Sequence, residues 1–219
     1  TYLSVSPLIE NLVETAMLTF DLAKKAGVKK IVRSSGMGAS EDAQITLGKW
    51  HGQVETALKN SGFLYTIIQP ASFMQNYLKY KDSIVAQGSF YAPLGEGKAS
   101  LVDVRDVGRA MAKVAKSNEH NGKTFVATGS EALSCTDIAR IFSETLKYPV
   151  KFVDVPESAA EDSMKKMGMP AWLIKCLAEL NYITKAGYVA EVSPDLKQLL
   201  GKTSTFKEFA SDHSKVFQK

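Results

Sequence analysis

Two patterns of apolar and polar residues divide the chain into short strands and longer helices. Short runs rich in β-branched residues are typical of buried strands, whereas apolar residues that recur every three or four positions are typical of helices with one buried face. The short runs predict strands at residues 1–6, 29–33, 64–69, 90–91, 124–128 and 151–155, with a turn at 93–97.

Capping residues and glycines mark the expected helix boundaries. Ser6-Pro7 predicts a helix start, because serine can cap a helix and proline is preorganised for its first turn. Gly27 predicts the end of that helix. Ser134 and Thr205 each precede a carboxylate by three residues, which is the spacing of a capping box. Further helices are expected over residues 47–58, 72–86, 104–114, 134–146, 157–167, 171–184, 194–200 and 205–217.

This alternation predicts an α/β fold with a Rossmann-like, doubly wound parallel sheet. Strands joined through helices pair in parallel, and helices then cover both faces of the sheet. We expect residues 1–130 to form the sheet domain, including a segment at 88–103 that crosses to the other lobe, and residues 131–219 to form a smaller, mostly helical lobe. Ligands of such sheets bind beyond the carboxyl ends of the strands, here residues 4–6, 33–36 and 69–73.

Composition and charge narrow the class of protein. The 219 residues are 45% hydrophobic and 23% charged with a net charge of +4, which is ordinary for a soluble protein and too mild to indicate nucleic-acid binding. The basic residues that do cluster have no aromatic residues between them, so we expect a solvated helix end rather than a phosphate-binding patch. The cluster comprises Lys24, Lys25, Lys29, Lys30 and Arg33.

The cysteine content bears on the cellular compartment, and the lengths of the apolar runs bear on whether a segment could span a membrane. Cys135 and Cys176 are too few for a disulfide framework or a zinc site, which favours a reduced, cytoplasmic location. No apolar run approaches the ~18 residues that a membrane span requires.

The glycines do not form a complete dinucleotide fingerprint. Such a fingerprint reads Gly-x-Gly-x-x-Gly, and it places a helix N-terminus against the pyrophosphate. Gly36 and Gly38 follow a predicted strand, but no third glycine and no immediate helix follow them. Gly95 and Gly97 precede an extended stretch. We therefore interpret all four as turn residues.

Several segments in order resemble the NmrA-like branch of the atypical short-chain dehydrogenase/reductases, in particular its NAD(P)H:quinone oxidoreductase-type members. The resemblance spans essentially the whole chain. It rests on Ala26-Gly27-Val28-Lys29-Lys30-Ile31-Val32-Arg33-Ser34-Ser35, His51-x-x-x-Glu55-x-x-Leu58-x-x-Ser61-Gly62, Tyr65-Thr66-Ile67-Ile68-Gln69-Pro70-x-x-Phe73-Met74-Gln75-Asn76, Gly88-x-Phe90-Tyr91, Val102-Asp103-Val104-Arg105-Asp106-Val107 and Gly129-x-Glu131-Ala132-Leu133-Ser134.

The resemblance aligns residues 1–6 with the fourth strand of the family fold. It implies that the family's first three strands, together with the glycine-rich turn that contacts the cofactor phosphates, have no counterpart in this sequence. An unpaired sheet edge promotes association, so we expect a protein partner or an oligomer to cover it.

The resemblance also implies which residues contact an NADP or NAD cofactor. Serine hydroxyls and backbone groups at the strand ends would hold the nicotinamide, and apolar residues would exclude water from it. Alternatively, serines at strand ends only cap the following turn. The implied cofactor residues are Ser4, Ser6, Ser34, Ser35, Gly36, Pro70, Ala71 and Phe73.

The catalytic Tyr-x-x-x-Lys motif of short-chain dehydrogenases is replaced here by His51-x-x-x-Glu55. The spacing places both side chains on one helix face. A neighbouring carboxylate would raise the pKa of the imidazole, which makes His51 a candidate proton donor and Glu55 its partner. The alternatives are a surface pair or a hydrogen bond that pins the adjacent loop. Trp50, Tyr77 and Tyr91 could form the walls of a planar substrate site or could be core residues.

Two functions remain open from the sequence. The first is an NAD(P)H-dependent oxidoreductase that transfers a hydride to a quinone or similar carbonyl, with a small molecule as its partner. The second is a non-enzymatic NAD(P)-binding redox sensor or a structural subunit of a larger assembly, which the missing Tyr-x-x-x-Lys motif favours.

Overall fold

The computed structural model describes residues 2–3 and 9–218 as an α/β protein with two compact units. The first unit comprises Thr1–Pro70 and Val107–Ala127, and the second comprises Ala71–Asp106 and Thr128–Lys219. Residues 71–106 are therefore compact with the C-terminal part of the chain. The predicted domain boundary between residues 130 and 131 stays a prediction. The helix start at Ser6-Pro7 lies outside the described residues.

The first unit contains a parallel sheet with the strand order β1-β2-β3-β6, as the alternating pattern predicts. The strands are β1 (Tyr2–Leu3), β2 (Lys30–Ser34), β3 (Leu64–Pro70) and β6 (Lys123–Ala127). Ser34 pairs with Ile68, and Pro70 pairs with Ala127. This register brings the carboxyl ends of β2 and β3 to the same edge of the sheet, where ligands of parallel sheets bind.

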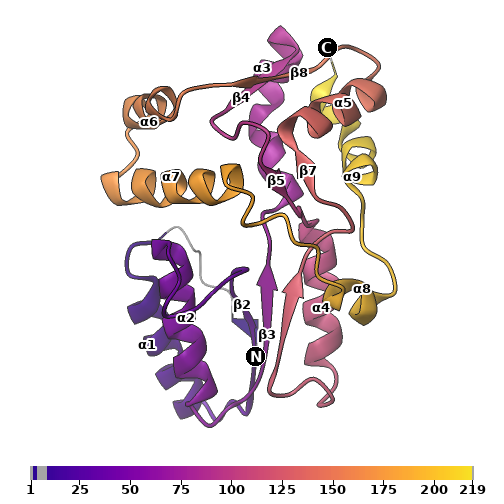
Figure 1. Cartoon of the computed structure of the whole chain (residues 1–219). Helices are drawn as coiled ribbons and strands as arrows, with labels where there is room; N and C mark the ends of the chain where they lie inside the picture. The colour runs from indigo at the N-terminus through magenta and orange to yellow at the C-terminus, as the bar shows by residue number, and fades with distance from the viewer. Residues whose placement is uncertain (1, 4–8, 219) are drawn as a thin grey trace. The chain divides into compact units, whose positions relative to one another are not determined.

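Helices cover both faces of this sheet (Figure 1). Helices α1 (Leu12–Lys25) and α2 (Thr46–Lys59) lie on one side, and residues 107–115 of α4 (Val104–Ala115) lie on the other. The apolar stripes of α1 and α2 face β2 and β3 in one core cluster. Its buried members are Leu12, Ala16, Phe20, Ile31, Val54, Leu58 and Ile67.

The second unit is built from two small sheets and several helices. Strands β4 (Ser89–Ala92) and β8 (Lys151–Asp154) pair in parallel, and β5 (Lys98–Ala99) and β7 (Leu133–Ser134) pair antiparallel. Five fully buried phenylalanines form much of its core: Phe90, Phe142, Phe206, Phe209 and Phe217. Its remaining helices are α5 (Cys135–Leu146), α6 (Glu157–Lys166), α7 (Ala171–Lys185), α8 (Asp195–Leu200) and α9 (Phe206–Asp212).

Two predicted helices of this unit differ in detail from the structure. Residues 72–86 form a 3-10 helix, η1 (Met74–Tyr80), followed by the short α3 (Lys81–Gln87). The last helix divides into α9 and the 3-10 helix η2 (Ser214–Phe217). Both capping boxes are confirmed, because the Ser134 and Thr205 side chains accept hydrogen bonds from the backbone three residues later.

Two kinds of feature are missing from residues 2–3 and 9–218. None of their helices combines the length and apolar character needed to cross a membrane. No group of three or more His, Cys, Asp or Glu side chains among them is arranged to hold a metal ion.

Candidate functional site

The loop after β2 is held against the end of β3 by backbone hydrogen bonds. The Ser35 amide donates to the Ile68 carbonyl at 2.8 Å, and the Met37 amide donates to the Pro70 carbonyl at 2.9 Å. These bonds extend the pairing of the two strands past Ser34. The predicted cofactor residues at both strand ends in this unit are therefore close together, whereas Ser4 and Ser6 lie outside the described residues.

Helix α2 packs closely against the same loop through two glycines on one helical face. A methyl group on Gly52 would overlap the backbone of Ser40, and one on Gly48 would lie 2.7 Å from the Ala43 Cβ atom. Two glycines four residues apart lower helix stability by about 1 kcal/mol each. A helix that carries two such glycines indicates close packing at that face, and the sequence analysis did not use this signal.

The free energy of unfolding of a Gly52→Ala variant is expected to be about 1–2 kcal/mol lower than that of the unmodified protein, because the added methyl forces the loop and α2 apart. Gly108→Ala is the matched control: this glycine also lies within a helix, but nothing lies within 4 Å of its added methyl. The free energy of unfolding of this control should rise by roughly 0.5–1 kcal/mol. Urea unfolding of both variants measures the difference, and equal changes would contradict the packing argument.

His51 on α2 faces Arg33 on β2, and not Glu55 as the sequence predicts. The His51 Nδ1 and Arg33 Nη2 atoms lie 3.1 Å apart. A guanidinium has only hydrogen-bond donors, so Arg33 donates and Nδ1 accepts. The imidazole is therefore neutral and carries its proton on Nε2.

The predicted rise in the pKa of His51 is wrong for the same reason. Burial lowers the pKa of His51 to about 4, and the positive charge of Arg33 contributes to this fall. The i,i+4 spacing correctly places His51 and Glu55 on one helix, but the charge that contacts the imidazole is positive. His51 can thus donate a hydrogen bond from Nε2, but it is not an imidazolium proton donor at neutral pH.

Glu55 is bonded to the neighbouring strand and to its own helix. The Gln69 side chain donates to one Glu55 carboxylate oxygen at 2.9 Å, and Lys59 lies 3.4 Å from the other. Glu55 is buried, and its charge partly opposes the effect of burial on Arg33. Glu55 therefore links α2 to β3 and supplies the negative charge that Arg33 needs in this buried environment.

Arg33 is 1% exposed, so it does not belong to the solvated basic cluster expected from the sequence. Burial lowers the pKa of Arg33 to about 10. Its Nε and Nη1 atoms have no hydrogen-bond partner within the described part of the chain. The sequence signal for this residue, a cation at the end of the apolar run Ile31-Val32, was available but was interpreted as solvated.

Ser35 and Gly36 begin the loop after β2, and Gly36 lies against the imidazole. The Ser35 hydroxyl is buried and has no partner among the described residues. A methyl group on Gly36 would lie 3.3 Å from His51 Cδ2 and 3.7 Å from Nε2, so glycine allows the imidazole to lie close to this loop. The unpaired Ser35 hydroxyl is a group that a polar ligand such as a carboxamide could bond.

The other predicted residues lie in different surroundings. Trp50 belongs to the first unit, where it is half-buried against the core between α1 and α2. In the second unit, Ala71 is buried and the backbone of Phe73 pairs with Val102. Tyr77 and Tyr91 line a cavity of about 720 Å³ in that unit.

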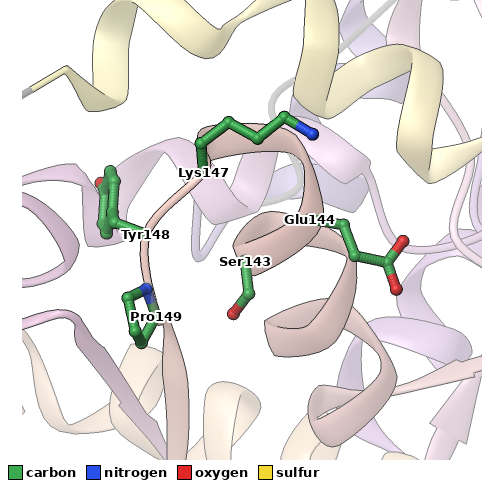
Figure 2. Close-up of a pocket in the computed structure, with 5 residues that line it drawn as sticks. All are labelled: Ser143, Glu144, Lys147, Tyr148 and Pro149. Atoms are coloured by element: carbon green, nitrogen blue, oxygen red, sulfur yellow. The ribbon is translucent and has the colours of Figure 1, made fainter.

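A second hollow, of about 500 Å³, lies over the turn between α5 and β8 (Figure 2). Ser143 accepts a hydrogen bond from the Val150 amide at 2.8 Å, and the Tyr148 hydroxyl donates to the Phe217 carbonyl at 2.7 Å. Lys147 has a φ of 63° and ends α5. These contacts explain the turn, and the polar groups described in it do not converge on a ligand.

Comparison with known proteins identifies relatives over nearly the whole chain. The model of the NmrA-like family matches residues 2–210. An NAD(P)H azoreductase of Xenophilus azovorans is 35% identical over 214 residues, which cover 97% of this chain and 75% of the relative. Quinone oxidoreductase 2 of Escherichia coli is 27% identical over 183 residues, which cover 84% of this chain and 64% of the relative.

Solved structures share the fold. The NADPH complex of the quinone oxidoreductase QOR2 from Escherichia coli superposes with a TM-score of 0.84 at 25% identity, and the match covers 96% of this chain and 74% of that one. The negative transcriptional regulator NmrA in complex with NADP gives a TM-score of 0.74 at 17% identity, covering 98% of this chain and 74% of that one. The second match concerns the fold alone.

Proposed function

Because the chain belongs to the NmrA-like family, we propose that it is an NAD(P)H-dependent oxidoreductase that transfers a hydride to a quinone or a similar carbonyl acceptor. The relatives named azoreductase and quinone oxidoreductase support this reaction class. The observation that carries the proposal is the neutral imidazole of His51, whose Cδ2–Nε2 edge faces Gly36 in the loop after β2.

The strand ends of the first unit would hold the reactive end of the cofactor. Bound NAD(P)H supplies the hydride. The unpaired hydroxyl of Ser35 is suited to the nicotinamide carboxamide, and glycine at position 36 lets the His51 imidazole lie close to this loop. Ser34 and Pro70 frame the same edge of the sheet through the β2–β3 pairing.

His51 would stabilise the negative charge that develops on the acceptor oxygen. Its Nε2–H is a fixed donor, because Arg33 occupies Nδ1 and determines the tautomer. A hydrogen bond from Arg33 also withdraws electron density from the ring and strengthens the Nε2 donor. Because the ring stays neutral, the proton that completes the reduction would come from water. We propose Glu55 as a positioning residue rather than a catalytic one.

The decisive experiment measures NADPH and NADH binding by titration and their oxidation with a quinone acceptor. Cofactor binding together with acceptor-dependent oxidation is the expected result. Cofactor binding without turnover of quinones, azo compounds or carbonyls would favour the sensor function instead. Binding of neither nucleotide would overturn both. A cytoplasmic location and a partner at the sheet edge stay predictions.

A Ser35→Ala variant is expected to bind NADPH about fivefold more weakly, because the loss of one neutral hydrogen bond costs about 1 kcal/mol. Fluorescence titration with NADPH measures the change. Ser211→Ala, which removes an exposed hydroxyl on α9, should leave the affinity unchanged. If Ser35→Ala binds as tightly as the unmodified protein, the hydroxyl does not contact the cofactor.

A further inference from the structure

The cavity of the second unit has an aromatic wall and a flexible apolar wall. The aromatic wall consists of Tyr77 and Tyr80 on η1 and Tyr91 on β4. The Tyr77 and Tyr80 rings are fixed by contacts with Phe90, whose centroid lies 5.9 Å and 5.3 Å from theirs. The volume of about 720 Å³ is within the range of small-molecule sites. Rigid tyrosine faces suit a planar aromatic ligand.

The opposite wall comes from α6, α7 and the turn between them, and Figure 1 shows these two helices in succession. Met164, Met167 and Met169 line it, and Met167 is 64% exposed. None of the residues of α6 is buried. Methionine side chains adapt to ligands of different outline, and a helix without buried residues can shift at little cost. This wall therefore suits large ligands of varied shape.

Lys79 is the only charged residue among the described residues that line the cavity. Its ammonium lies 4.8 Å from the centre of the Tyr80 ring. Surrounding protein atoms lower the pKa of Lys79, although its side chain remains accessible to solvent. No carboxylate in this lining neutralises the ammonium. An anionic ligand in the cavity could form a charge-assisted hydrogen bond with this ammonium.

We propose that this cavity binds a planar aromatic molecule with an anionic substituent, and that Lys79 pairs with the anionic group. The inference concerns binding alone and does not rest on the proposed function. Asn76 and Asn181 also line the cavity and can donate to further oxygens of such a molecule. Lys79 is then the residue that determines the ligand specificity of this cavity.

Two anthraquinones that differ in one substituent test the proposal. Anthraquinone-2-sulfonate carries the anionic group, and 2-(hydroxymethyl)anthraquinone presents the same rings without a charge. Calorimetric titration measures the binding of each to the unmodified protein and to the variants. We expect tighter binding of the sulfonate, and Lys79→Met should weaken it about tenfold while changing the affinity for the neutral compound less than about twofold.

Two further variants serve as controls. Lys81→Met removes an exposed cation two residues away that does not line the cavity, and it should leave both affinities unchanged. Lys79→Arg keeps the charge and should restore most of the sulfonate affinity. Equal weakening of both compounds by Lys79→Met, or no weakening of either, would overturn the proposal.

Turnover separates this inference from the proposed function. Binding of the sulfonate that depends on Lys79, in a protein that binds neither NADPH nor NADH, would leave the ligand site standing and overturn the reductase. Reduction of a quinone by NADPH, together with sulfonate binding that does not depend on Lys79, would overturn the site and leave the reductase standing.

Discussion

Replacing His51 with asparagine should lower kcat for quinone reduction about 100-fold, which is the loss typical of removing one preorganised donor to a developing oxyanion. The Oδ1 atom of the introduced asparagine can take the place of Nδ1 and still accept from Arg33, whereas nothing in the shorter side chain reaches the position of Nε2. The fold and the contact with β2 are therefore retained, and only the donor is lost. Steady-state kinetics with NADPH and a quinone measure the effect.

Two control variants test whether the loss of the Nε2 donor causes this fall in kcat. His51→Gln places an amide N–H near the position of Nε2 and should recover about tenfold of the lost rate. His213→Asn alters an imidazole that bonds the Phe209 carbonyl in the second unit, and it should leave kcat unchanged. A His51→Asn enzyme with unaltered kcat would show that the imidazole only connects α2 to β2.

The fold was largely predictable because its elements have strong local signals. The apolar runs at Ile31-Val32 and Ile67-Ile68 are strands in a parallel sheet, and the capping boxes at Ser134 and Thr205 begin α5 and α9. The two-residue strands β5 and β7 were missed, because a single pair of residues carries no periodicity. Such strands are defined only by the pairing partner.

The sequence predicted which strand ends and which helix come together at the candidate site, but not the electrostatics there. Strand ends and helical spacing placed Ser35, His51 and Glu55 near the edge of a parallel sheet. The hydrogen bond between Arg33 and His51 joins residues 18 positions apart, and no local pattern indicates which side of the imidazole an arginine approaches. The sign of the pKa shift depends on that contact and on burial, so it could only come from the tertiary structure.

The pairing of a buried arginine with a histidine explains how a site without Tyr-x-x-x-Lys could still polarise a carbonyl. A histidine beside a carboxylate would gain a proton near neutral pH and could act as an acid. Here the adjacent charge is positive, so the imidazole stays neutral and the tautomer is fixed. Stabilisation by a fixed neutral donor does not require the ring to change its protonation state during turnover.

The free energy of unfolding should fall by about 2 kcal/mol between pH 7 and pH 5 through His51 alone. The pKa of this imidazole is about 4 in the folded protein, against an ordinary value of 6.5. The unfolded chain therefore binds the proton first, and acid favours unfolding. The contribution is fully present above pH 6.5 and is progressively lost as the pH falls towards 4.

Urea unfolding of the unmodified protein and of His51→Asn at both pH values isolates this contribution. The asparagine cannot be protonated, so the variant should lose about 2 kcal/mol less stability over the interval. Carboxylates with lowered pKa, such as those of Asp103 and Asp137, remain largely ionised in the folded and unfolded states at pH 5 and cancel in the comparison. A parallel decline of the two proteins would mean that His51 is protonated in the folded state, and the neutral-donor role would then fail together with the pH dependence.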